Sequence, residues 1–224
     1  MTNISSQRYL HIIDEICTLR WTSLNREQLL AVAWAYYFFS VQFRENLEVA
    51  CEMLPGDERL ILLREGECDT DNLSPFPGIA ASGERMNHDE FVRRLIDQAE
   101  FPAAEAARLE SLGAAYLAFS RSAEPMARAQ SIASYEDGGL ERVFSAILTA
   151  QDWSHPSLRA FHHFLVEHIR FDSDPDGGHG ALSRHLVPDD RILPLWVAFR
   201  DLLVQSTPEL LTGQFAETAE QVVC

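Results

Sequence analysis

Apolar residues recur at helical spacing along nearly the whole chain, and this pattern constrains the fold more than any other feature of the sequence. The first segment shows it, because Tyr9, Ile12 and Ile16 fall on one face of a helix. No stretch of useful length alternates apolar and polar residues in the way that a half-buried strand does. The sequence therefore predicts an all-α bundle of about seven to ten helices, forming a single domain over residues 1–224.

Capping residues and helix breakers place the elements of this bundle. Asn25 has the position of an N-cap, two residues before Glu27, for a long helix that Pro55 and Gly56 end. That helix is apolar around most of its circumference, which predicts that it is largely buried. The other helices are expected over residues 57–67, 88–96 after the N-cap Asn87, 103–120, 126–134, 136–149, 156–171, 191–205 and, more weakly, 208–223. The intervening residues 69–83 predict an ordered loop of a length that is often functional.

Charge and hydropathy exclude several classes of partner. With 34 acidic and 18 basic residues, the chain has a formal net charge of -16, so binding to nucleic acid or anionic lipid is not expected. The longest apolar run, residues 29–43, is interrupted by Ser40 and Gln42 and falls short of the roughly 20 residues of a membrane helix. The first 20 residues show no secretory signal, and a cytoplasmic location is expected.

The four cysteines do not form a recognisable metal or redox motif. Cys17, Cys51, Cys68 and Cys224 are widely separated, and no Cys-x-x-Cys pair occurs. This spacing indicates neither a zinc knuckle nor a redox dithiol. We interpret the cysteines as reduced thiols.

Ionisable residues on the apolar faces of predicted helices are the main functional signal. His168 continues the apolar stripe of the helix over 156–171, and Asp172 lies one turn further along the same face. His88 shares a stripe with the apolar residues of the helix that begins near it, and Glu136 shares the stripe of the helix expected over 136–149. The sequence therefore places imidazoles and carboxylates from separate helices toward the interior.

The third predicted helix offers two candidate carboxylates. Glu67 shares a face with Leu60 and Leu63, whereas Glu65 lies beside Ile61. Either could point inward, and the pattern favours Glu67 slightly.

Buried carboxylates and imidazoles on separate helices need a common partner, because burying one unpaired carboxylate costs several kcal/mol. A metal ion meets this need, and imidazole with carboxylate suits iron, manganese or zinc. Each residue also has an ordinary structural interpretation. His168 could be a hydrogen-bonded core histidine, His88 a helix-start histidine bonded to backbone, Asp172 a helix end and Glu136 a partner of a helix N-terminus. Their coincidence on apolar stripes favours the metal.

Four segments resemble the haem-oxygenase-like diiron oxidases and oxygenases. Residues 167–172, Glu-His-Ile-Arg-Phe-Asp, followed by the Gly-His-Gly of residues 178–180, resemble the His-x-x-x-Asp and His-Gly signature of that superfamily. Residues 24–53 look like its second helix, which relatives of thiaminase-II and pyrroloquinoline-quinone synthase share. Residues 87–95 look like its first ligand helix, and residues 129–136 like its central helix. The resemblance spans residues 20–203.

The resemblance implies a haem-oxygenase-like bundle that holds two Fe(II) ions and uses O2 as co-substrate. The implied ligands are Glu67 (or Glu65), His88, Glu136, His168, Asp172 and His179, with Glu136 bridging the two ions. Six residues separate Asp172 from His179, more than in the usual pattern, so His185 remains an alternative last ligand. The implied function is that of a non-haem diiron oxidoreductase, an oxygenase of specialised biosynthesis. It would oxidise a small, amino-acid-derived substrate by N-oxygenation, oxidative C–C cleavage or desaturation.

Two other functions remain open at this stage. One is a metal-free hydrolase like thiaminase-II, with Cys51 or Cys68 as nucleophile, and the other is a non-catalytic metal-binding helical protein. Arg93 or Arg94 could hold a substrate carboxylate or simply face solvent.

A homodimer is also an expectation of the fold. Leu195, Trp196 and Phe199 would lie either at its interface or in the core of the bundle.

Overall fold

The computed structural model describes residues 7–172, with only the backbone of Asp172, and residues 178–211. Ten α-helices and four short 3-10 turns lie in this part of the chain: α1 (Arg8–Cys17), η1 (Trp21–Ser23), α2 (Arg26–Met53), α3 (Glu58–Glu67), α4 (His88–Asp97), α5 (Ala103–Ser122), α6 (Pro125–Glu136), α7 (Gly139–Ile147), α8 (Pro156–Asp172), α9 (His179–Ser183), η2 (Arg184–Leu186), η3 (Asp190–Ile192), α10 (Leu193–Ser206) and η4 (Pro208–Leu210). The described residues contain two isolated β-bridges and no strand. The prediction of an all-α bundle is confirmed.

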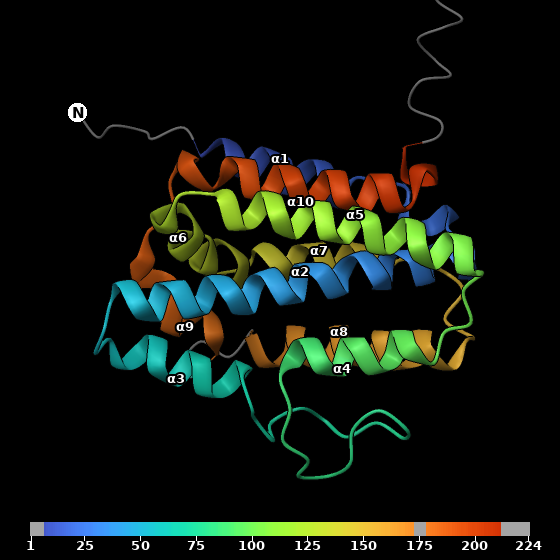
Figure 1. Ribbon diagram of the computed structural model, residues 1–224, viewed down its shortest axis with the longest axis horizontal. Coiled ribbons are helices and arrows are strands. Elements are labelled where there is room, and N and C mark those ends of the chain that lie inside the picture. The colour runs from blue at the N-terminus through green and yellow to red at the C-terminus, as the bar shows by residue number, and fades with distance from the viewer. Residues whose placement is uncertain (1–6, 173–177, 212–224) are drawn as a thin grey trace, which may run out of the picture.

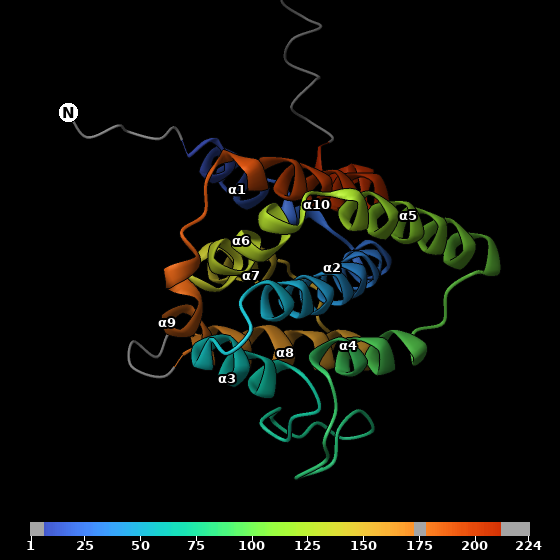
Figure 2. The same ribbon diagram turned by 60° about the vertical axis from the view of Figure 1, so that its left-hand side comes forward.

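The helices form three layers around α2 (Figures 1 and 2). Helices α1, α5 and α10 make one outer layer, α2, α6 and α7 the middle layer, and α3, α4, α8 and α9 the other outer layer. Helix α2 packs against α4, α5 and α6, which places it at the centre of the bundle. Because both of its sides are covered, α2 has buried residues around most of its circumference, as its sequence predicts.

A capping box fixes the start of α2. The backbone N–H of Gln28 donates to Asn25 Oδ1 at 3.0 Å, and the backbone N–H of Asn25 donates to Gln28 Oε1 at 2.8 Å. The two side chains thereby satisfy amides that the first turn of a helix leaves without partners. The N-cap expected at Asn25 is present.

The helix expected over 136–149 begins later in the structure, as α7 at Gly139, because α6 continues to Glu136. Glu136 is the last residue of α6 and does not lie on the stripe of α7. Gly138 has a φ of 88°, in the left-handed region, and this turn separates the two helices. Glu136 therefore stands at the C-terminus of α6 and not in the first turn of a helix, as the ordinary structural interpretation required.

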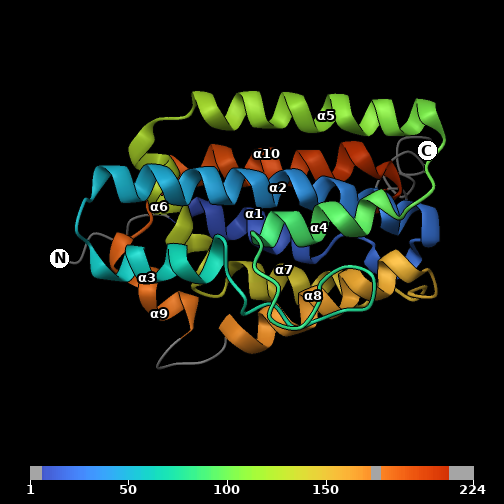
Figure 3. The same ribbon diagram turned by 60° about the horizontal axis from the view of Figure 1, so that its bottom comes forward.

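The loop of residues 68–87 is ordered, as expected. Thr70 and Met86 exchange two backbone hydrogen bonds, of 3.0 and 2.9 Å. The backbone N–H of Asp69 donates to Asn87 Oδ1 at 2.9 Å, so the side chain of Asn87 closes the loop and does not cap α4. Figure 3 shows the loop lying over α8, where Ser74 Oγ donates to Glu167 at 2.6 Å.

The layer formed by α10 contributes its large apolar residues to the core. Leu195, Trp196 and Phe199 are fully buried within the chain, so they are core residues and not interface residues. The expected helix over 208–223 begins as the turn η4, and its residues 212–223 lie outside the described residues. Among residues 7–172 and 178–211, no helix combines the length and apolar character that crossing a bilayer requires.

Candidate metal centre

Five of the six predicted ligands meet in the interior between the middle layer and the layer of α3, α4, α8 and α9. They are donated by helix ends or by a buried helix face: Glu67 ends α3, His88 begins α4, Glu136 ends α6, His168 lies on α8 and His179 begins α9. Each of two groups offers three ligand atoms that lie within 4.8 Å of one another. Residues more than 100 positions apart in the sequence thus form one cluster.

The first group consists of Glu67, His88 and His168. Nδ1 of His88 lies 2.8 Å from Oε2 of Glu67 and 3.0 Å from Nε2 of His168. Nδ1 of His168 is directed away from the group, toward the backbone carbonyl of Phe164 at 2.9 Å. Two imidazoles and one carboxylate therefore converge on one point.

The second group consists of Glu67, Glu136 and His179. Nδ1 of His179 lies 2.8 Å from Oε1 of Glu67 and 3.3 Å from Oε2 of Glu136. The two oxygens of Glu67 thus face different groups. The resemblance implied that Glu136 is the shared carboxylate, whereas these distances give that position to Glu67.

The cluster is buried and contains two carboxylates. Glu67 and Glu136 are each 6% exposed, and the carboxyl-terminal end of a helix is an unfavourable place for the charge of Glu136. Burial acts to raise the pKa of Glu67, but the His88 and His179 imidazoles together lower it more and hold it well below its usual range. The site therefore favours the ionised form of Glu67, and a cation could bind between this carboxylate and the neighbouring imidazoles.

The arginine beside the cluster is already paired with another carboxylate. Arg44 is the one basic side chain lining the small cavity between the first group and Glu136, and it forms a forked ion pair with Asp89, at 3.1 Å. That cavity has a volume of about 20 Å³, which is enough for one small ion or water molecule. Charge and space both fit a metal ion.

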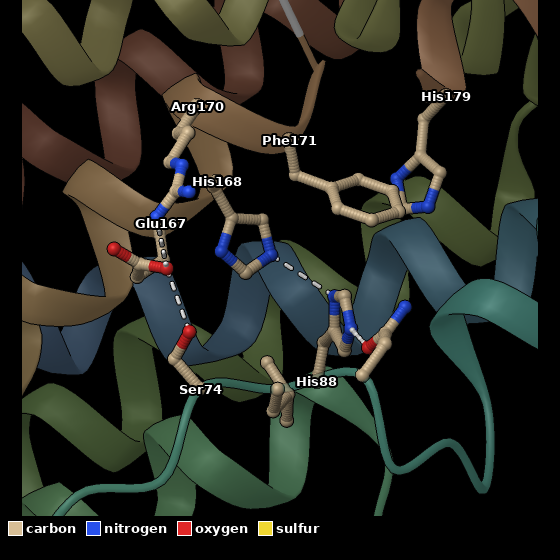
Figure 4. A pocket seen from close by; sticks show the side chains of 9 residues that line it. Ser74, His88, Glu167, His168, Arg170, Phe171 and His179 are labelled. Carbon is tan, nitrogen blue, oxygen red and sulfur yellow. Dashed lines mark hydrogen bonds and ion pairs between the residues drawn. The ribbon is translucent and has the colours of Figure 1, made fainter. Parts of the chain in front are cut away.

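A larger pocket of about 310 Å³ reaches the cluster from outside (Figure 4). The imidazoles of His88, His168 and His179 face it in the close view. Its other walls come from the loop of residues 68–87 and from the end of α8: Asn72, Leu73, Ser74, Glu167, Arg170 and Phe171. A small molecule in this pocket would contact the outer edges of three candidate ligands.

The structure separates the alternatives that the sequence left open. Glu65 is exposed on α3 and belongs to neither group, whereas Glu67 belongs to both. His185 is not part of the cluster, because its Nε2 lies 2.8 Å from Oδ2 of Asp57 and fastens η2 to the start of α3. The side chain of Asp172 lies outside the described residues.

Two residues that support the cluster carry no obvious signal in the sequence. A Cβ atom at Gly66 would lie 2.9 Å from Nε2 of His179, so only glycine allows the observed approach. Oδ1 of Asn72 lies 3.2 Å from Nε2 of His88. Asn72 lies in a loop, where no periodicity indicates the direction of a side chain, and Gly66 has no side chain that a periodic pattern could place.

The two arginines that could have held a substrate carboxylate form ion pairs elsewhere. Arg93 pairs with Asp97, at 3.0 Å, and Arg94 pairs with Glu84 at 2.7 Å. Neither arginine lines the pocket beside the cluster.

The two candidate nucleophiles are poorly suited to attack. Burial raises the pKa of the Cys51 thiol, and burial together with the Glu67 carboxylate raises the pKa of Cys68 to about 12. Because the thiolate is the reactive form, neither residue is activated at neutral pH.

Comparisons of this chain with protein-family models, with curated proteins and with solved structures gave no match. The chemistry of the site therefore follows from its own geometry.

Proposed function

We propose that the protein is a non-haem diiron enzyme that uses O2 to oxidise a small molecule bound in the pocket beside the cluster. The observation that carries the proposal is the position of Glu67, whose two oxygens face two separate groups of nitrogen and oxygen donors. A carboxylate in that position is suited to join two cations. Imidazole with carboxylate suits iron, manganese or zinc, and the preference for iron comes from the sequence resemblance.

The residues of the cluster would divide the work of holding two ions. His88 and His168 would serve one ion, Glu136 and His179 the other, and Glu67 both. Two ferrous ions held in this way would supply the electrons for the reduction of O2. The buried aromatic residues on the α2 side, including Tyr36 and Phe39, would keep bulk water away from ions bound there.

The pocket supports a substrate that has both an apolar part and charged groups. Leu73 and Phe171 offer apolar surface, whereas Glu167 and Arg170 provide one charge of each sign near the rim. An amino-acid-derived molecule carries an ammonium and a carboxylate that match these two side chains. Its apolar part would then lie toward the imidazoles.

The test begins with metal binding. Protein prepared without metal is titrated anaerobically with ferrous iron, and close to two equivalents should bind. His185→Gln is a matched control, because His185 follows His179 by only six residues in the sequence but belongs to neither donor group. Absence of iron uptake by the unaltered protein would refute the proposal.

Oxygen consumption separates an enzyme from a metal-binding protein. The diferrous protein, exposed to O2 together with a panel of amino acids and amines, should consume O2 faster with one of them than without any. Binding of iron without accelerated O2 consumption would instead support storage or sensing of metal. Hydrolysis by the metal-free protein that Cys51→Ser abolishes would support the thiaminase-II-like alternative.

A further inference from the structure

We infer that Asn72 is a positioning residue, which holds His88 in the tautomer that directs Nδ1 toward the metal site. The inference rests on the proposed metal centre for its purpose, but the tautomer itself can be observed without any metal. Asn72 belongs to the loop of residues 68–87 and not to any helix that carries a ligand.

The orientation of the Asn72 amide is fixed by its neighbours. Nδ2 of Asn72 donates to the backbone carbonyl of Gly66 at 2.8 Å. Since a carbonyl oxygen can only accept, the NH2 end of the amide must face Gly66. The backbone N–H of Asn72 donates to Oγ1 of Thr70 at 3.2 Å, which holds the residue in the loop. Oδ1 is thereby directed at His88.

This orientation determines which ring nitrogen of His88 carries the proton. Nε2 of His88 lies 3.2 Å from Oδ1 of Asn72, and an amide oxygen accepts a hydrogen bond but cannot donate one. Nε2 must therefore be the N–H donor, and in the neutral imidazole Nδ1 then has a lone pair. That lone pair is directed into the first group, 2.8 Å from Oε2 of Glu67.

His168 is arranged in the same way by a different acceptor. Its Nδ1 lies 2.9 Å from the backbone carbonyl of Phe164, so Nδ1 is the donor and Nε2 presents the lone pair. Nε2 of His168 and Nδ1 of His88 lie 3.0 Å apart. Two neutral rings held in this way would face each other lone pair to lone pair, next to a carboxylate. A divalent cation relieves this repulsion for all three donors, whereas a single proton relieves it for one pair.

An outer acceptor of this kind is known to orient a ligand imidazole and to raise its basicity, and its loss typically weakens metal binding about 10–100-fold. Asn72 is itself exposed and lines the open pocket, where water can partly replace its oxygen. We therefore expect the lower end of that range. The same loop supplies Leu73 and Ser74 to the pocket wall. One loop therefore contacts both the pocket and the proposed metal site.

Three variants test this role in the full chain. Asn72→Leu keeps the approximate size and removes the acceptor, while Asn72→Asp restores an acceptor oxygen. Thr70→Val is the control for the loop, because it removes the hydrogen bond to the Asn72 backbone without touching His88. Circular dichroism checks that each variant remains helical.

The first measurement reads the tautomer in the metal-free protein by 15N NMR of the histidine rings, at mildly alkaline pH. His88 should be protonated on Nε2 in the unaltered protein, in Asn72→Asp and in Thr70→Val. In Asn72→Leu we expect Nε2 to lose its proton, so that the ring is protonated on Nδ1 alone, where Glu67 accepts. An unchanged Nε2–H signal in Asn72→Leu would overturn the inference.

The second measurement is a titration of the same proteins with Co(II) alone. Asn72→Leu should bind one of two cobalt ions about 10-fold more weakly and lose one exchangeable imidazole N–H signal in the paramagnetic NMR spectrum. Asn72→Asp should restore both properties. Equal weakening by Thr70→Val would show that only the loop matters and would overturn the inference. If the unaltered protein binds no cobalt but keeps the Nε2–H tautomer, the metal centre fails while the positioning of His88 by Asn72 stands.

Discussion

The two donor groups share Glu67 but differ in the residues that complete them. The first adds two imidazoles, His88 and His168, and both of these line the open pocket. The second adds Glu136 and His179, and of these only His179 reaches the pocket. The second group thus has more negative charge and less contact with solvent. In the proposed centre the two groups would divide two tasks: the second group would retain its ion, and the first would present its ion to small molecules.

The largest expected effect comes from the residue that the two groups share. Glu67→Gln removes the charge from both groups at nearly constant volume, so binding of both ions should weaken by more than about 100-fold, beyond the loss that an outer partner causes. A titration with ferrous iron or Co(II) measures the change. Glu65→Gln makes the same change on the exposed face of the same helix and should leave binding unaltered.

If Glu67→Gln keeps one ion at unaltered affinity, Glu67 belongs to one group only and another carboxylate joins the ions.

Substitutions confined to one group should remove one ion and leave the other. Glu136→Gln should eliminate the more tightly bound equivalent, and His168→Ala the weaker one, because each changes a donor that only one group uses. Isothermal titration of metal-free protein should then show two sites reduced to one in both variants. The reverse assignment of the tight and weak sites would contradict the difference in charge between the groups.

A methyl group at Gly66 tests the second group without removing a donor. In Gly66→Ala the new Cβ would lie 2.9 Å from Nε2 of His179, so the ring must move and its ion should bind about 10-fold more weakly, as when an orienting contact is lost. Gly113→Ala is the matched control, because its Cβ meets Phe38 in the core, away from the centre. It should lower stability but leave metal affinity unchanged. Weaker binding in both variants would mean that Gly66→Ala acts through stability alone.

Apolar spacing predicted the helices and much of the centre, because a helix that packs in a bundle must keep one continuous apolar face. His88 and His168 interrupt such faces and could be located on that ground alone. Glu136 was assigned to the wrong helix, since the turn at Gly138 decides where α6 ends, although its burial was expected. The choice of Glu67 as the shared carboxylate depends on where two oxygens of one side chain point, and spacing does not contain that information.

The contact of Asn72 with His88 could also not be predicted from the sequence. Its contact with His88 depends on the path of a loop of irregular backbone, which the bridge between Thr70 and Met86 and the hydrogen bond to Asn87 hold in place. Loops follow tertiary contacts and not a repeating pattern.

The smallest expected effect is that of Glu136→Gln on the free energy of unfolding. This substitution should stabilise the metal-free protein and destabilise the metal-bound protein. In the metal-free protein this carboxylate is buried at the C-terminal end of α6, where the helix dipole opposes it, and the His179 imidazole at 3.3 Å offsets part of the cost. Glu136→Gln should therefore raise the free energy of unfolding of the metal-free protein by about 1 kcal/mol. With metal at 100 times its dissociation constant, the unaltered protein gains about 2.7 kcal/mol per ion, and the variant loses the gain from one ion. Urea denaturation with and without metal should thus rank the two proteins in opposite orders.

The matched control uses the same substitution at the opposite kind of helix end. Glu141 lies in the first turn of α7, where an acid is favourable. Glu141→Gln should lower the free energy of unfolding by about 0.5 kcal/mol, equally with and without metal. If Glu136→Gln also destabilises the metal-free protein, the carboxylate contributes to folding without a cation. The second group would then be an ordinary hydrogen-bonded cluster, and only the first would remain a candidate metal site.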